Sequence, residues 1–180
     1  MTEQTRTFLQ ILSDMLATFA VYGVMILLLL TLMANWSLPY FSVMKPQLFL
    51  IAVFYWTLYR PRFLPAPMIF VAGLLLDLMT PAVPMGTHAF SYLLIAGLMR
   101  PRRRMIMGQP FIAVWIWFAL AAFIDLVVKV LIIGALSPTP IQIWTLALAA
   151  FVTVLSFPLL LMVFVLLQRL LPATRSLVPA

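Results

Sequence analysis

Four ionisable side chains lie within or beside long apolar runs of this sequence: Asp77, His88, Asp125 and Lys129. Carboxylate, imidazole and ammonium groups can bind a polar ligand, transfer protons or pair with one another. If the surrounding helices lie in a membrane, a charged group at a helix centre costs roughly 2.5–3.5 kcal/mol on insertion scales. Each group therefore needs a partner or an aqueous surface, and its chemistry depends on which helices meet.

Asp125 and Lys129 are four residues apart, which places them on one face of a helix in the favourable order, with the acid first. One interpretation is structural: the two residues neutralise each other, or Lys129 bridges to Asp77, and the register of the helices becomes fixed. The other interpretation is a polar pocket open to the outer face of the membrane, lined by Asp77, His88, Asp125 and Lys129. The sequence is compatible with both.

Known catalytic patterns do not occur in the sequence. It has no H-E-x-x-H, no G-x-S-x-G and no glycine-rich phosphate loop, and it contains no cysteine. Asp77 and Asp125 could form an acid dyad, but a nearby Lys129 would keep both ionised and prevent them from sharing a proton. We therefore expect a protein that is not an enzyme, with no catalytic residues, no metal site and no cofactor.

Composition indicates the class of protein. Of the 180 residues, 66% are hydrophobic and 8% are charged, and the mean hydropathy is +1.17. Long apolar stretches in such a chain are typical of membrane-spanning helices. The net charge of +7 suggests nucleic acid at first, but the basic residues cluster at the ends of apolar runs, as topology determinants do. We expect a single all-α integral membrane domain over residues 1–180 and no nucleic-acid partner.

Prolines divide the chain into six predicted transmembrane helices, because proline cannot donate to the helix ladder and clashes with the preceding turn. Thirteen of the 14 prolines, Pro101 among them, are predicted at or between helix ends, and Pro158 alone lies inside a helix. The third and fourth helices are short, since about fifteen residues rise roughly 22 Å against a hydrocarbon core of ~30 Å. The predicted ranges are about 15–34, 42–59, 65–80, 86–99, 110–134 and 141–168.

The basic residues predict the orientation of these helices. With both termini in the cytoplasm, nine of the 11 basic residues fall in inner loops and tails, and Lys129 falls in the fifth helix. An excess of positive charge on the inner side favours this arrangement of six crossings. A re-entrant hairpin over residues 65–99 would satisfy the same rule, because the arginines at 60–62 and 100–104 would still lie inside.

A short break joins the third and fourth predicted helices. The segment 80–86 carries no charge; Pro84 stiffens it, and Gly86 permits an unusual backbone angle before the next helix. Asp77 can face the interior beneath this turn, one helical turn inside the end of the third helix. His88, at the start of the fourth helix, is expected to be wetted by solvent. Small residues are predicted to allow close packing of helices: Ala72, Gly73 and Gly97.

Two stretches around this break carry a family resemblance. G-L-L-L-D-L at 73–78 precedes the break, P-M-G-T-H-A-F-S-Y-L follows it at 84–93, and R-P stands upstream at 60–61. In their order and spacing these residues resemble the MreD family of rod-shape-determining membrane proteins. The resemblance covers about 60–104 and extends elsewhere only as hydropathy and topology; the pair Asp125 and Lys129 is not part of it. The resembling positions are Gly73, Leu74, Leu75, Asp77, Leu78, Pro84, Gly86 and Ala89.

The resemblance implies a role that composition does not show. The MreD family works in the cell-elongation machinery of rod-shaped bacteria, and its fold is similar to the substrate-binding subunits of energy-coupling-factor vitamin transporters. Membership implies a non-catalytic protein of the bacterial inner membrane that binds MreC. Through MreC it would influence the MreB filament and the peptidoglycan synthase formed by RodA and a penicillin-binding protein. Membrane lipid and a second copy of the chain are further expected partners.

The rival function is that of a substrate-binding membrane subunit of a small-molecule transporter, with the four ionisable residues as its ligand site. Such a site should be rich in converging polar and aromatic groups, and here only four polar candidates converge. The outer loops are also short and nearly uncharged, which favours the scaffold role. The candidate structural or partner-binding positions are Gly73, Asp77, Pro84, Gly86, His88, Asp125 and Lys129.

Overall fold

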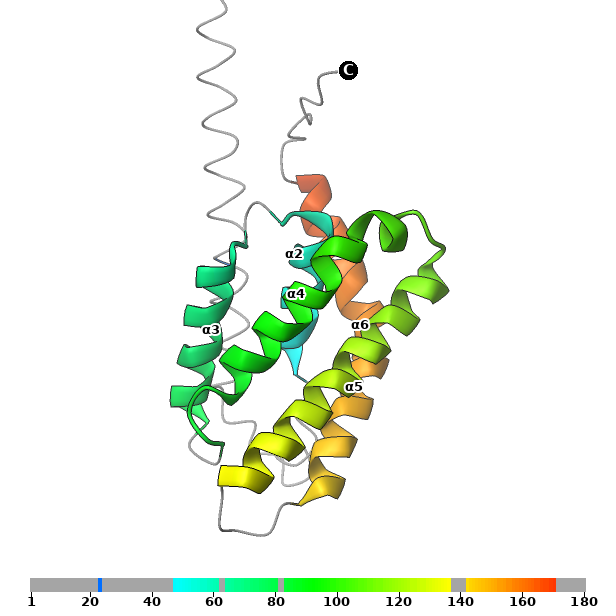
Figure 1. Ribbon diagram of the computed structural model, residues 1–180. Helices are drawn as coiled ribbons and strands as arrows, with labels where there is room; N and C mark the ends of the chain where they lie inside the picture. Colours follow the sequence, from blue (N-terminus) through cyan, green and yellow to red (C-terminus); the bar gives the residue numbers. More distant parts are fainter. Residues whose placement is uncertain (1–22, 24–46, 62–63, 81–82, 137–141, 171–180) are drawn as a thin grey trace, which may run out of the picture.

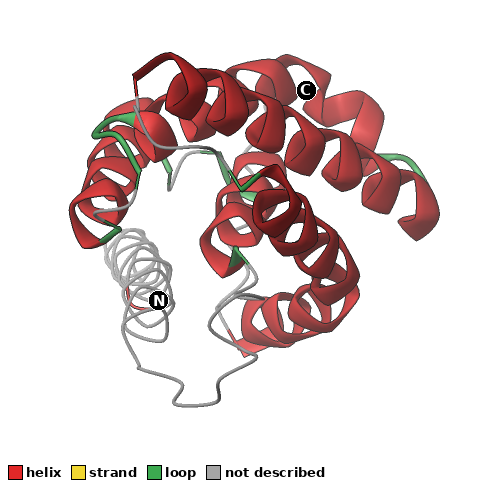
Figure 2. Ribbon diagram, turned by 90° about the horizontal axis from the view of Figure 1, so that it is seen from below, coloured by secondary structure: helices red, strands yellow, loops and turns green. Residues whose placement is uncertain are grey.

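The computed structural model describes residues 23, 47–61, 64–80, 83–136 and 142–170, and within these ranges every regular element is a helix (Figures 1 and 2). The helices are α2 (Leu48–Tyr59), α3 (Ala66–Met79), α4 (Thr87–Met107), α5 (Phe111–Leu136) and α6 (Ile143–Leu170). They run alternately up and down in Figure 1, so α2 and α4 end, and α3 and α5 begin, at the upper end of the bundle. The predicted all-α class is confirmed for the described residues.

Most of the predicted helix bounds agree with the structure. The helices predicted at 65–80, 110–134 and 141–168 correspond to α3, α5 and α6 within two residues at each end. The helix predicted at 42–59 ends where α2 ends, but Gln47, which the prediction placed inside it, is the N-cap, and α2 begins at Leu48. Residues 42–46 lie outside the described part of the chain. The helix predicted at 15–34 also lies outside it, apart from Gly23, which is helical.

The fourth predicted helix, 86–99, is wrong at its C-terminal end. α4 continues to Met107, so Pro101 lies inside a helix and the arginines at 100–104 belong to that helix instead of a loop. Proline removes the hydrogen bond to the carbonyl four residues earlier and crowds that carbonyl. Four residues before Pro101, the carbonyl belongs to Gly97, where an added Cβ would have no neighbour within 4 Å. Gly97 therefore does not mediate close helix packing, contrary to the prediction.

Tertiary contacts hold this extension of α4 against the bundle. Ile106 is fully buried in the hydrophobic core. Arg103 donates through Nε to the carbonyl oxygen of Leu58, and through Nη2 to that of Tyr59 at 3.4 Å. Arg100 donates to the carbonyl oxygen of Leu64 at 2.6 Å. Carbonyls at a helix C-terminus lack partners and carry partial negative charge, so these cations stabilise the end of α2 and the link that follows.

α2 lies in the core and packs against α4, α5 and α6. Every residue from Phe49 to Leu58 is buried, which explains why the helix is apolar nearly all round. The Phe54 ring lies 5.2 Å from the ring of Phe118 in α5, and that ring stacks on Phe157 of α6 at 4.3 Å between centroids. Aromatic pairs of this kind contribute about 0.5–1.5 kcal/mol beyond their burial, so this cluster holds the three helices together.

Two of the described helices are long and apolar enough to cross a membrane. They are α5, with 26 residues, and the segment Ile143–Val165 of α6, with 23 residues. Both expose large apolar side chains along their outward faces, for example Ile116 and Leu159. α3 has 14 residues, so the predicted shortness of the third helix is confirmed, whereas α4, with 21 residues, is longer than predicted.

Candidate functional site

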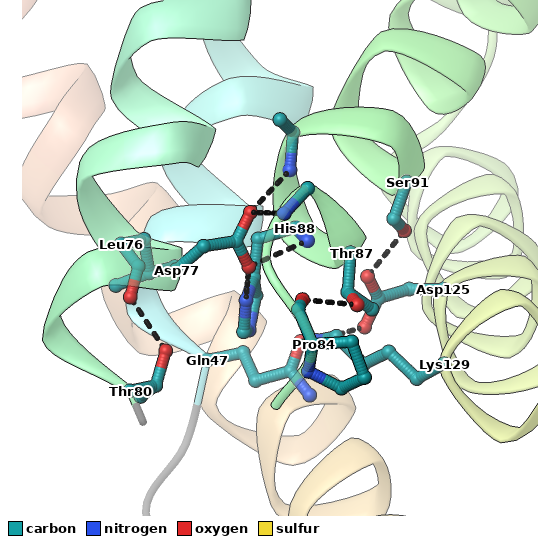
Figure 3. A network of polar contacts seen from close by, with 12 residues as sticks. Gln47, Leu76, Asp77, Thr80, Pro84, Thr87, His88, Ser91, Asp125 and Lys129 are labelled. Carbon is teal, nitrogen blue, oxygen red and sulfur yellow. Dashed lines mark hydrogen bonds and ion pairs between the residues drawn. The ribbon is translucent and has the colours of Figure 1, made fainter. Parts of the chain in front are cut away.

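Asp77 closes the turn between α3 and α4 (Figure 3). Its Oδ2 accepts the backbone N–H of Gly86 at 3.0 Å and that of Ala89 at 3.3 Å. Its Oδ1 accepts the backbone N–H of His88 at 3.0 Å. The first turn of a helix has N–H groups without intrahelical partners, and a negative charge there also meets the positive end of the helix dipole. Asp77 of α3 therefore caps the N-terminus of α4, which we call the cross-helix cap.

Other described residues of the turn also form hydrogen bonds. Gly86 adopts a φ of +94°, in the left-handed region, which agrees with the predicted unusual backbone angle. The Thr87 hydroxyl donates to the carbonyl oxygen of Pro84 at 2.7 Å. The Thr80 hydroxyl donates to the carbonyl oxygen of Leu76 at 2.5 Å. Hydrogen bonds therefore tie both described ends of the break to the helices beside it.

His88 is buried, so the prediction of a wetted helix-end residue is wrong. Its Nδ1 lies 2.7 Å from Oδ1 of Asp77, and its ring centroid lies 5.8 Å from that of Tyr92. A carboxylate only accepts hydrogen bonds, so Nδ1 carries a proton and donates it. The carboxylate that caps the helix also provides the partner that allows the imidazole to be buried.

Gly73 allows α3 and α4 to approach closely enough for this cap. A Cβ at Gly73 would lie 2.4 Å from Cα and 2.7 Å from the backbone N of Ala89. Asp77 follows Gly73 by four residues and so lies on the same face of α3. The close approach at Gly73 brings the N–H of Ala89 within reach of the Asp77 carboxylate. Four resembling positions, Gly73, Asp77, Gly86 and Ala89, therefore form one structural unit.

Two glycine substitutions test this close approach. Gly73→Ala is expected to lower the free energy of unfolding by about 1–3 kcal/mol, because the new methyl group meets backbone atoms that cannot turn aside. Gly97→Ala, also within a helix but in open space, should leave stability unchanged or raise it by about 0.5–1 kcal/mol. Thermal unfolding of the purified protein in detergent measures both. Equal effects of the two substitutions would contradict the proposed contact.

Asp125 and Lys129 form a buried ion pair at the centre of a second set of hydrogen bonds. Lys129 Nζ lies 2.7 Å from Oδ2 of Asp125. Asp125 also accepts the hydroxyl of Ser91 in α4 at 2.5 Å, and Lys129 donates to Oε1 of Gln47 at 2.7 Å. The backbone N–H of Gln47 donates to the hydroxyl of Thr153 in α6 at 2.8 Å. These bonds, which we call the inter-helix network, join α4, α5 and α6 to the start of α2.

Lys129 therefore pairs with Asp125 and not with Asp77, which decides between the two structural alternatives. The cross-helix cap and the inter-helix network nevertheless lie close together. The ring of Tyr92, which is fully buried, has its centroid 5.8 Å from that of His88 and 6.0 Å from Lys129 Nζ. The four ionisable residues thus gather in one region, as their predicted positions along the helices suggest.

No protein-family model, curated protein or solved structure matches this chain. What the site can do chemically follows from its geometry. Asp77, His88, Asp125 and Lys129 are each at most 7% exposed, and they bind one another, the backbone and the side chains of Ser91 and Gln47. Among the described residues, no three histidine, aspartate or glutamate side chains come together as metal ligands. The arrangement positions helices and leaves a ligand little polar surface.

Three members of the inter-helix network were not predicted from the sequence: Gln47, Ser91 and Thr153. Their signal was present, because Ser91 and Thr153 stand inside apolar runs, where an unpaired hydroxyl costs free energy. Neutral polar residues are common, however, and nothing local connects Gln47 to Lys129, 82 residues later in the chain. Only the ionisable residues were chosen as candidates, because burying a charge costs more free energy than burying a neutral polar group.

Proposed function

We propose that this protein is a non-catalytic, MreD-type component of the bacterial inner membrane, with six crossings and both termini in the cytoplasm. In this role it binds MreC and supports MreB-linked peptidoglycan synthesis during cell elongation. The proposal is carried by one observation, that Gly73, Asp77, Gly86 and Ala89 form a single structural unit. Residues that hold one another in place are expected of a motif that defines a fold. The unit therefore supports the family resemblance that these positions carry.

The burial and mutual bonding of the polar residues favour a scaffold over a transporter subunit. A ligand site needs polar groups that converge on an accessible cavity. Here the candidate groups are buried and bound to one another. The exposed surfaces of the described residues include apolar helix faces, such as those around Phe70 of α3 and Leu159 of α6. Such faces suit contact with lipid or with the transmembrane helix of a partner.

The depth of the α3–α4 turn agrees with a membrane setting. Ser91 binds Asp125, and α4 begins about one helical turn before Ser91, whereas α5 continues for about three turns beyond Asp125. The turn therefore lies roughly two helical turns short of the end of α5. If α5 spans the bilayer, an unsatisfied backbone group at that depth costs several kcal/mol. The cross-helix cap supplies the hydrogen bonds that water cannot supply there.

Co-purification tests the proposed function. A tagged copy, extracted from its native membrane in a gentle detergent, is expected to bring MreC and peptidoglycan-synthesis proteins with it, as identified by mass spectrometry. Photo-crosslinkers at the exposed positions Phe70 and Leu159 show which helix face meets the partner. A crosslinker at Phe118, which is fully buried, is the matched control and should capture no partner. Recovery of a transporter ATPase module without MreC would replace the proposal by the transporter alternative.

A further inference from the structure

The upper end of the bundle in Figure 1, where α2 and α4 end, carries positive charge without a compensating carboxylate among the described residues. Four arginines lie there on α4 alone, at residues 100 and 102–104. The aspartates of the described ranges, Asp77 and Asp125, belong to the cross-helix cap and the inter-helix network. Asp125 follows the first residue of α5 by about four helical turns, which is far beyond ion-pair distance. The counter-charge for this end must come from outside the described residues.

The four arginines on α4 divide into two pairs. Arg100 and Arg103 bind backbone carbonyls of the α2 end and the following link. Arg102 and Arg104 are exposed. Arg102 donates only to the carbonyl oxygen of Leu98 in its own helix, at 3.0 Å. The second pair therefore has guanidinium groups that can bind an external anion.

Exposed apolar side chains follow the exposed arginines in the chain. Met105 and Met107 come after Arg104 in α4, and Phe111 and Ile112 begin α5 after a short link; all four are exposed. A face that serves only to be solvated would carry polar neighbours instead. Positive charge beside apolar side chains matches the boundary between headgroups and acyl chains of a bilayer. Nucleic acid or an acidic peptide would match the charge and leave the apolar side chains uncovered.

We propose that residues 102–112 form a binding surface for acidic phospholipids. Arg102 and Arg104 are two residues apart in α4 and so point to different sides of the helix, and each binds a headgroup phosphate, which a guanidinium group recognises through paired hydrogen bonds. Met105, Met107 and the first residues of α5 contact the acyl chains. Bound lipid neutralises this end of the bundle and holds the corner between α4 and α5 at the membrane surface. The inference rests on the membrane setting of the chain and is independent of MreC.

Lipid retention by the purified full-length protein tests the site. Native mass spectrometry is expected to show phosphatidylglycerol retained in preference to phosphatidylcholine. The double variant Arg102→Gln with Arg104→Gln should retain roughly tenfold less phosphatidylglycerol, in line with the attraction of basic residues to anionic membranes. The matched variant Arg102→Lys with Arg104→Lys keeps the charge but loses the paired hydrogen bonds, so its retention should lie between those of the wild type and the glutamine variant. Both variants should unfold at the temperature of the wild type without lipid, because the two side chains are exposed.

Several outcomes would overturn the site. Equal retention of the two lipids by the wild type would show that charge is not recognised. Unchanged phosphatidylglycerol retention in the glutamine variant would place the lipid elsewhere. Inorganic phosphate that raises the unfolding temperature as much as phosphatidylglycerol would indicate a site for free anions. An acidic peptide that binds where phosphatidylglycerol does not would indicate a protein partner.

Discussion

Replacing Asp77 by leucine is expected to lower the free energy of unfolding by about 3–5 kcal/mol, more than most single substitutions do. The carboxylate accepts three backbone N–H groups at the start of α4 and the Nδ1 proton of His88. Each donor left buried without an acceptor costs about 1–3 kcal/mol. Leucine offers no acceptor, and water reaches this turn poorly because Asp77 and His88 are both buried.

Thermal or denaturant unfolding in detergent measures this effect. Asp77→Asn keeps one oxygen acceptor and the side-chain shape but loses the charge, so we expect a smaller loss than with leucine. Thr145→Ala is the matched control, because it removes only an exposed hydrogen bond of 3.2 Å to Gln142 and should change stability by less than about 0.5 kcal/mol. A leucine variant as stable as this control would disprove the cross-helix cap.

Lys129→Leu alone should damage the protein more than the double replacement of Asp125 and Lys129 by leucine. The single substitution leaves a buried carboxylate with only the Ser91 hydroxyl as partner, a loss of about 3–5 kcal/mol. The double substitution removes both charges together. The Ser91 hydroxyl can then donate to a carbonyl of its own helix, so the main remaining loss is the hydrogen bond to Gln47.

A complete cycle of variants separates the ion pair from its surroundings. Asp125→Leu, Lys129→Leu and the double variant are compared with the wild type by the fraction of folded protein in detergent. Mutual pairing predicts that the losses in the two single variants sum to much more than the loss in the double variant. If the double variant loses at least as much as the single ones combined, the two charges do not stabilise each other.

The sequence predicted the helices well wherever local rules decide. Proline at a helix boundary and long apolar runs act within a few residues, and α3, α5 and α6 follow them closely. The same rule failed at Pro101 because distant contacts outweighed it. Burial of Ile106 and the bonds of Arg100 and Arg103 to carbonyls hold the helix beyond the proline. None of these partners is visible from the residues next to Pro101.

In the candidate site, too, local sequence predicts some features and distant contacts decide the others. The sequence marked Asp77 as a costly residue beneath a turn, but its partners are backbone N–H groups, which nearly every residue type provides equally. Because the partners of Asp77 could not be identified from the sequence, the burial of His88 was missed. A histidine without a partner at a helix end would be exposed to solvent. The partners Ser91, Gln47 and Thr153 lie 34 to 106 residues from the groups that they bind.

The sequence by itself determined the helical class, most helix bounds, the unusual backbone angle at Gly86 and the pairing face of Asp125 and Lys129. These features depend on backbone chemistry and spacing within one or two helical turns. Only the tertiary structure decided that Asp77 caps α4, that Lys129 reaches α2, and that α4 extends past Pro101. Each of these outcomes depends on which helices meet and how closely, and that is set by packing of the whole bundle, for instance by Gly73 against Ala89.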